Sequence, residues 1–379
     1  MLAQKGVPLL LGVAVVLIFF IGLDDSFPER TDRVAQGWTI DDEKRKIYGR
    51  YVFSGPDEAV IDAGYQPLAV PTGTVPAVMM RDGILARELG KIGKSVKFHP
   101  FFEGGDINSF LFSRHLEVMW AGDMPVIKAA ARFPVIVTAQ VKTAFAAIIT
   151  RNLYSMDRLK GRRVGYVPGS SAHQVLLNGL ALQGMTDKDV SLVEIPVNRM
   201  IGALREGMVD AIAVWEPTIT LAREQLKDHA VPYRALTQSF LYFSKDFFDK
   251  HFEAARLLTA ATLRAVRWMS RSRENARKAC QWHRALAEAF SRGTEFLSED
   301  QCLSILHRDL LDPLPMAMIP PESLHAEGAM SRKFLFLQQI GILDRTMDFK
   351  QVRSAFRTDL LEEMIMDKER WRIMEFDDR

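Results

Sequence analysis

The alternation of short apolar segments with helical stretches, from about Val60 to Pro217, constrains the fold more than any other feature of the sequence. The apolar segments 96–98, 116–120 and 163–167 are each followed by residues that can begin a helix. Repeated βαβ order implies parallel strands with helices on both faces of a sheet. The pattern restarts after Lys142, so we predict an α/β protein with two such sheets and hence two lobes.

Length and charge narrow the class of protein further. A chain of 379 residues exceeds the usual size of one domain, which agrees with two lobes. The 49 basic and 47 acidic residues balance closely, so no concentrated basic field suggests a nucleic-acid partner.

The two cysteines, Cys280 and Cys302, are too few to build a fold on disulfides. Outside the cytoplasm they could pair, but two free buried thiols are the default expectation. The spacing of Cys302 and His307 is not a helical one, so we do not read these cysteines and their neighbouring histidines as a metal site.

The N-terminus carries an apolar run, Val7 to Leu23, preceded by Lys5 and followed by two aspartates. A positive flank before an apolar stretch favours membrane insertion with the N-terminus in the cytoplasm. The run lies at the lower limit of what spans ~30 Å of hydrocarbon, so an uncleaved anchor and a cleaved signal peptide both stay open. Either one places the remaining chain in the periplasm or at the extracytoplasmic face of the cytoplasmic membrane, with residues 7–23 as the membrane contact.

Four turns between a strand and a helix have the chemistry of a ligand site. In open α/β sheets ligands bind beyond the carboxyl ends of the strands, and a helix N-terminus attracts anions. Three of the turns also have plainer explanations. Ser170 can simply cap its helix and His173 can lie on the helix surface, residues 121–125 can simply begin a helix, and Trp215 can plug the end of the sheet. The candidate ligand contacts are Tyr65, Gln66, Gly122, Asp123, Met124, Ser170, Ser171, His173, Trp215 and Glu216.

Taken together with segments 159–164 and 207–211, these turns resemble the nitrate/sulfonate/taurine group of ABC-importer binding proteins. The resemblance spans about residues 60–290 and implies a two-lobed type II periplasmic binding protein fold, with crossover strands near 140–144 and 237–243. One departure is Glu216, which stands where the group usually has aspartate. The implied division is a signal-anchor or signal peptide (1–25), a tether (26–56), lobe 1 (57–142 plus 237–292), lobe 2 (143–236) and a helical C-terminal extension (293–379) that could add a docking surface.

The resemblance implies a solute-binding protein that delivers a small solute to an ABC permease in the inner membrane, with no cofactor and no catalysis. The sequence contains no evident nucleophile or base, and residues 1–279 lack the cysteines of thiamine-pyrimidine enzymes. The alternatives are a membrane-tethered ligand sensor or adaptor and, further off, an enzyme of the thiamine-pyrimidine or menaquinone type. The serine turn predicts an oxyanion head such as sulfonate or nitrate, whereas Asp123 and Glu216 favour a zwitterion such as taurine, because carboxylates repel a pure anion.

Overall fold

The computed structural model describes residues 40–55, 59–291, 296–310 and 319–378. The predicted signal or anchor segment, including residues 7–23, lies outside these ranges. Within them, no helix is both long enough and apolar enough to span a membrane.

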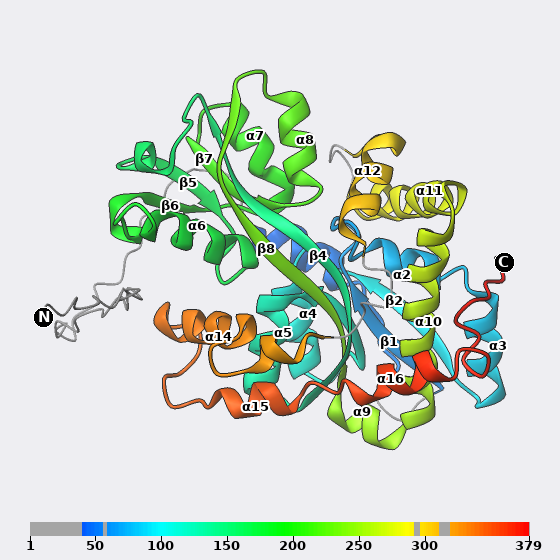
Figure 1. The fold of residues 1–379 in the computed structure, drawn as a ribbon. Helices are drawn as coiled ribbons and strands as arrows, with labels where there is room; N and C mark the ends of the chain where they lie inside the picture. The colour runs from blue at the N-terminus through cyan, green and yellow to red at the C-terminus, as the bar shows by residue number, and fades with distance from the viewer. Residues whose placement is uncertain (1–39, 56–58, 292–295, 311–318, 379) are drawn as a thin grey trace, which may run out of the picture.

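Eight strands form one mixed sheet in the order β2-β1-β3-β8-β4-β7-β5-β6 (Figure 1). β2, β1 and β3 are parallel at one end of the sheet, and β7, β5 and β6 are parallel at the other. We call these the first and second halves of the sheet. The strands are β1 (Val60–Tyr65), β2 (Ser95–Pro100), β3 (Val118–Gly122), β4 (Val135–Arg151), β5 (Arg163–Tyr166), β6 (Ser191–Glu194), β7 (Ala211–Trp215) and β8 (His229–Ser244).

Two long antiparallel strands, β4 and β8, join the halves and run through the centre of the molecule (Figure 1). β8 pairs with β3 through residues 239–243, and β4 pairs with β7 through residues 146–150. The chain therefore crosses between the halves close to the predicted segments 140–144 and 237–243. The sequence predicted two separate sheets, but β4 and β8 pair along nearly their whole length, and this makes one sheet of the two.

Helices cover both faces of each half, as the βαβ order predicted. In the first half, α2, α3, α10 and α11 bury one apolar cluster and α4 and α5 bury another. In the second half, α6 packs on one face and α7 and α8 pack on the other. The helices are α2 (Thr74–Met79), α3 (Gly83–Lys91), α4 (Gly104–Phe112), α5 (Asp123–Arg132), α6 (Ser171–Ala181), α7 (Met200–Arg205), α8 (Thr218–Gln225), α9 (Lys245–Lys250), α10 (Phe252–Arg271) and α11 (Arg273–Phe290), with the 3₁₀ turns η1 (Met156–Leu159), η2 (Asp187–Asp189) and η3 (Val197–Arg199).

The sequence of residues 75–89 is compatible with one continuous helix, but the structure has two, α2 and α3. α2 ends at Met79, and Asp82 caps α3, because its carboxylate accepts the N–H groups of Ile84 (3.0 Å) and Leu85 (3.2 Å). The same carboxylate accepts Nε of Arg264 from α10 at 2.7 Å, so the break also anchors the long helix that packs beside it.

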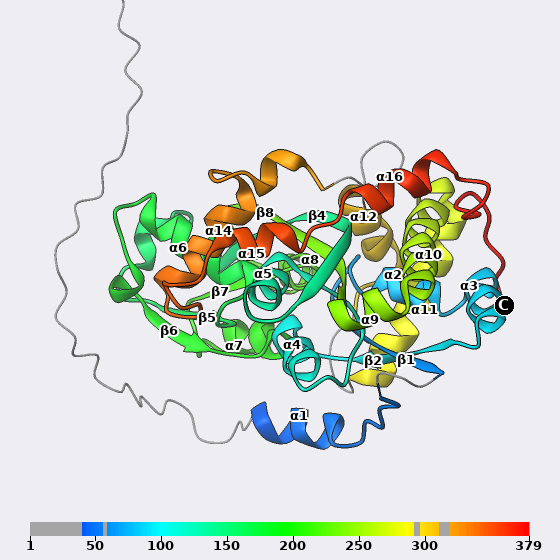
Figure 2. The same cartoon turned by 90° about the horizontal axis from the view of Figure 1, so that it is seen from below.

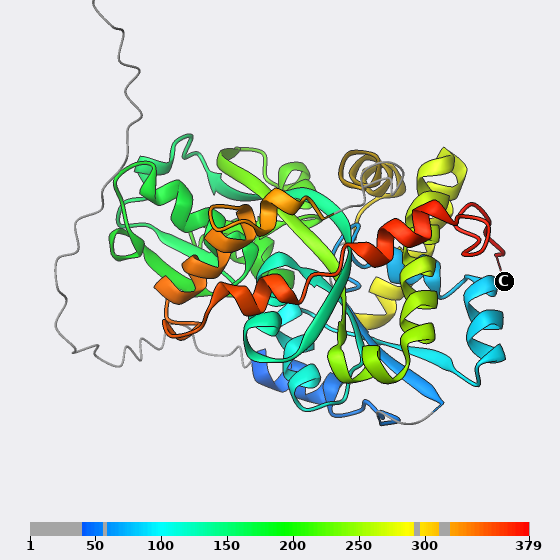
Figure 3. The same ribbon diagram turned by 60° about the horizontal axis from the view of Figure 1, so that its bottom comes forward.

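The C-terminal extension is helical, as predicted, and folds back over both halves. It comprises α12 (Glu299–Asp309), η4 (Pro321–Leu324), α14 (Ala329–Gln339), α15 (Phe349–Ser354) and α16 (Asp359–Met366). Figures 2 and 3 show α14, α15 and α16 as a continuous band that reaches from α6 to α10. The extension is therefore part of the folded body and covers one side of the junction between the halves.

Part of the segment that was predicted as a tether is also folded. α1 (Ile40–Tyr48) lies on the side of the molecule opposite the band (Figure 2). Lys44 forms an ion pair with Asp106 at 2.9 Å, and the hydroxyl of Tyr48 donates to the same carboxylate at 2.8 Å. Asp106 lies in the first turn of α4 and holds α1 in place through these two contacts.

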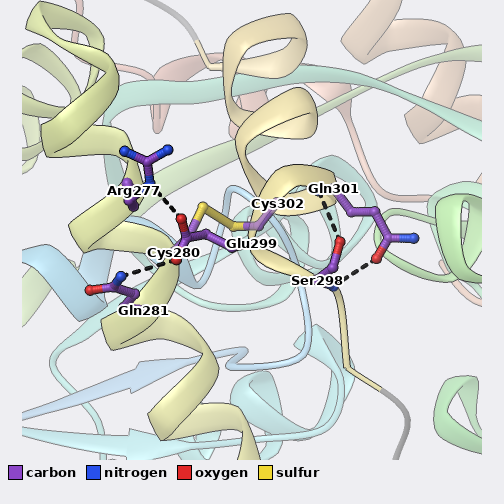
Figure 4. Close-up of a disulfide and its surroundings, with 7 residues drawn as sticks. All are labelled: Arg277, Cys280, Gln281, Ser298, Glu299, Gln301 and Cys302. Carbon is purple, nitrogen blue, oxygen red and sulfur yellow. Dashed lines mark hydrogen bonds and ion pairs between the residues drawn. A yellow bond between two sulfur atoms is a disulfide. The ribbon is translucent and has the colours of Figure 1, made fainter.

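A disulfide between Cys280 and Cys302 joins α11 to α12 (Figure 4). The default expectation of two free thiols was wrong, and the alternative of a pair is what the structure contains. The bond fixes the first helix of the extension to the last helix of the preceding fold.

Candidate functional site

The four predicted turns all begin at the carboxyl ends of strands that neighbour the crossing strands or lie one strand further out. Tyr65 ends β1, Gly122 ends β3, Tyr166 ends β5 and Trp215 ends β7. Two turns therefore belong to each half of the sheet, which is the arrangement expected of a site built between two halves.

Asp123 and Ser171 bring the two halves into direct contact. The Ser171 hydroxyl, at the start of α6, donates a hydrogen bond to the carboxylate of Asp123, at the start of α5. Gly122 lies at the same point, because a side chain there would meet Ser171 Oγ at 3.5 Å. Asp123 is fully buried and also accepts the backbone N–H groups of Gln238 (2.9 Å) and Met124 (2.8 Å).

A cation from the C-terminal extension completes the surroundings of Asp123. Lys333, on α14, forms a buried ion pair with the Asp123 carboxylate and lies 3.3 Å from Oε1 of Gln238. Burial would raise the pKa of Asp123, but the Lys333 ammonium and the hydrogen bonds from Ser171 and Gln238 outweigh it and hold this pKa below its ordinary value. Asp123 is therefore ionised and fully engaged.

Glu216 has an equivalent partner from the same extension. Nη2 of Arg308, on α12, donates to the Glu216 carboxylate at 2.7 Å, and the Thr220 N–H donates to it at 3.0 Å. Arg308 also forms a two-point contact with Asp309, and the hydrogen bond to Asp309 is the largest cause of a raised Arg308 pKa. Trp215, one residue earlier, is half-buried between the two apolar clusters of the second half.

The turn before α6 is shaped by its own side chains. Ser170 Oγ accepts the His173 N–H at 3.1 Å, so Ser170 does cap the helix, and His173 Nδ1 accepts the Gly169 N–H at 3.1 Å. Gly169 has φ +63°, a backbone conformation that favours glycine, and a side chain there would collide with Ile342 of the extension at 2.5 Å. The N–H groups at the start of α6 have no partner within the helix, as at every helix start.

Acidification should destabilise the protein through His173, by about 2 kcal/mol between pH 8 and pH 5. Burial lowers the pKa of His173 from 6.5 to about 4. The folded state therefore holds the neutral form, and its stabilisation is complete above pH 6.5 and is lost as the pH falls toward 4. Urea unfolding at several pH values should show that His173→Gln loses less unfolding free energy on acidification than the unmodified protein does. Burial also lowers the pKa of His283 to about 4, and this histidine affects the unmodified protein and the variant equally. If the free energy of unfolding falls equally with pH in the two proteins, the prediction is wrong.

The other predicted contacts lie deeper in the first half. Tyr65 is buried against Phe98 (ring centroids 6.2 Å apart), and Met124 belongs to the apolar cluster under α4 and α5. Gln66 is also buried and donates weakly to the Phe102 carbonyl at 3.4 Å. The structure thus brings Gly122, Asp123 and Ser171 together but packs Tyr65 and Met124 into the core.

The residues missed by sequence reasoning are mainly cations. Lys142 lies on β4 at the crossing point and is almost completely buried. Burial lowers its pKa, while the charges of Asp309, Asp123 and Glu216 oppose that effect. Its position within the predicted crossing segment was a usable signal, because a lysine in an otherwise apolar strand needs buried partners. Lys333 and Arg308 had no comparable signal.

A cavity of about 1110 Å³ opens on the side away from the α14–α16 band. It lies between α7 and β6 of the second half and the α11–α12 pair, and it reaches Pro67 and Pro217, which directly follow Gln66 and Glu216. None of the ten predicted residues is among those that line it. In the described part of the chain, no group of three or more His, Cys, Asp or Glu residues could hold a metal ion.

Two βα halves joined by two crossing strands, with helix N-termini converging between them, define the α/β fold of periplasmic solute-binding proteins. The model of the NMT1-like family matches residues 135–284, which contain the crossing strands and the second half. The relatives described next confirm the predicted resemblance to the nitrate/sulfonate/taurine group.

By sequence, the chain is 24% identical over 208 residues to the taurine-binding periplasmic protein of Escherichia coli, covering 52% of this chain and 64% of that protein. The chain therefore spans less than two thirds of the length of the curated relatives it matches. Among solved structures, the alkanesulfonate-binding protein SsuA of Xanthomonas axonopodis, bound to MOPS, matches with a TM-score of 0.61 and 18% identity, covering 79% of this chain and 99% of that one. The nitrate-binding protein NrtA of Synechocystis matches with a TM-score of 0.58 and 16% identity, covering 83% and 90%.

The taurine-binding and nitrate-binding relatives are named as periplasmic binding proteins, whereas the desulfurization enzyme DSZB also matches the fold, with a TM-score of 0.54 and 12% identity. At these identities the solved structures establish the fold of this chain.

Proposed function

We propose that the protein is an extracytoplasmic solute-binding protein that captures a small oxyanion-bearing solute between the two halves of its sheet and delivers it to an ABC permease. The observation that carries the proposal is the contact of Ser171 with Asp123, which places turns from both halves at one point. The N-terminus of α6 offers N–H groups and a favourable dipole to an anionic head.

The surrounding geometry supports capture without chemistry. Asp123 and Glu216 are both held in ion pairs, so neither is free to act as a general base. The cavity of about 1110 Å³ reaches Pro67 and Pro217, the residues that directly follow Gln66 and Glu216. The relatives named above bind taurine, alkanesulfonate and nitrate, and these solutes share a compact oxyanion head.

A thermal-shift screen of the purified chain should identify the solute class. The panel contains ethanesulfonate, taurine, nitrate, bicarbonate, amino acids and pyrimidines. A ligand at 100 times its dissociation constant stabilises the folded state by ~2.7 kcal/mol, which raises the melting temperature by roughly 5 °C. A folded protein that responds to no member of the panel would contradict the proposal.

The matched variant for this screen is Trp215→Ala. Trp215 is half-buried at the end of β7 and directly precedes Glu216, so it can pack over a bound solute. The variant should fold and lose most of the ligand-induced shift. An unchanged shift would move the site away from this turn while leaving the binding function intact.

A further inference from the structure

The C-terminal extension supplies a cation to each predicted carboxylate of the site. Lys333 pairs with Asp123 of the first half, and Arg308 pairs with Glu216 of the second half. Asp123, Lys333 and Glu216 are each more than nine-tenths buried. The two pairs come from different helices, α14 and α12, so the coincidence does not follow from a single local contact.

A primary ammonium bound to a buried carboxylate is the contact that the amino group of a zwitterionic solute would make. Asp123 already receives Lys333, Ser171 and two backbone N–H groups, and these leave little of its acceptor capacity unused. Glu216 receives the Arg308 guanidinium and the Thr220 N–H. Lys142, which is buried like Lys333, adds a further cation that experiences the charges of both carboxylates, whereas the Arg308 side chain is 45% exposed.

We propose that Lys333 and Arg308 occupy the positions that the ammonium group of a solute would otherwise take. The site therefore binds solutes whose only charge is anionic and rejects solutes that carry an ammonium group. This proposal rests on the proposed function and names its solute class. A second ammonium beside Asp123 would be repelled by Lys333 in a buried setting, where like charges interact strongly. An anionic head at the start of α6 would meet backbone N–H groups, and the Asp123 carboxylate that accepts from Ser171 at this point is neutralised by Lys333.

The sequence alone favoured the opposite solute. Asp123 and Glu216 read as unpaired carboxylates that would repel an anion and attract an amine. Their partners lie 210 and 92 residues further along the chain, and the reversal of specificity depends on those partners.

Ethanesulfonate and taurine are the matched probes, because they differ only by one amino group. Their dissociation constants are measured by calorimetry on the full-length chain, on Lys333→Met and on Lys350→Met, a control at an exposed position of the same extension. The unmodified protein and the control should bind ethanesulfonate at least 10-fold more tightly than taurine. Lys333→Met leaves Asp123 without its cation, so taurine affinity should rise at least 10-fold while ethanesulfonate gains nothing.

The outcomes separate this inference from the function on which it rests. If the unmodified protein binds taurine as tightly as ethanesulfonate, the inference is wrong and the binding function stands. If it binds neither probe nor any other anion of the screen, both fall together. If Lys333→Met fails to fold, two other measurements decide the question. The first is the preference of the unmodified protein between the two probes. The second is the variant Lys333→Met/Asp123→Asn, which removes both charges and should bind taurine no more than 3-fold more weakly than ethanesulfonate.

Discussion

Replacing Arg264 by methionine should lower the free energy of unfolding by about 3–5 kcal/mol. Arg264 is 3% exposed and its partner Asp82 is 1% exposed. Nε of Arg264 donates to the Asp82 carboxylate at 2.7 Å, and Nη1 donates to the Trp371 carbonyl at 3.0 Å. The substitution leaves a buried carboxylate without its cation and also releases the C-terminal residues from α10.

Denaturant unfolding of the purified variant measures the effect, and the chain contains its own control. Arg87 pairs with Asp377 at 2.5 Å, but both side chains are about half exposed. Arg87→Met should therefore cost less than ~1 kcal/mol. A loss of that small size for Arg264→Met would show that the buried pair does not stabilise the fold.

Removing the disulfide should cost about 3 kcal/mol of stability. Cys280 and Cys302 are separated by 22 residues, so the bond restricts a loop of moderate length in the unfolded chain. In the folded state it holds α12, and therefore Arg308, beside α11 (Figure 4). Cys280→Ser and Cys302→Ser should each reach this value by denaturant unfolding.

Reduction provides the matched control for the disulfide. A reductant should destabilise the unmodified protein by the same amount and leave the double variant Cys280→Ser/Cys302→Ser unaffected. If the unmodified protein unfolds at the same denaturant concentration with and without reductant, although its thiols are fully reduced, the bond contributes nothing.

The fold was largely predictable because its signals are local. Apolar runs such as 163–167 and 211–214 became β5 and β7, and the crossing segments fell where the βαβ pattern restarts. The split of helix 75–89 had a local signal too, since Asp82–Gly83 is a typical turn pair. The single sheet was not predictable, because it depends on how far β4 and β8 continue to pair.

The site was predictable only in its backbone. The turns at Asp123 and Ser171 carry local signals, and the structure places them in contact. The electrostatic states of Asp123 and Glu216 depend on Lys333 and Arg308 respectively, and both cations lie in a segment without a recognisable motif. Lys142 was within a predicted crossing segment, but only the folded surroundings reveal three carboxylates near it. Charge in a buried site is therefore set by distant partners more than by the motif itself.

The long separation between Lys333 and Asp123, 210 residues, has a consequence for the order in which the molecule assembles. A contact of this kind closes a large loop, and the entropy of closing it must be offset before the contact is stable. During synthesis all eight described strands are complete at Ser244, before the last 135 residues have emerged. Asp123 and Glu216 thus lack their cationic partners until the C-terminal extension arrives, and the anion selectivity that we propose would be established only then.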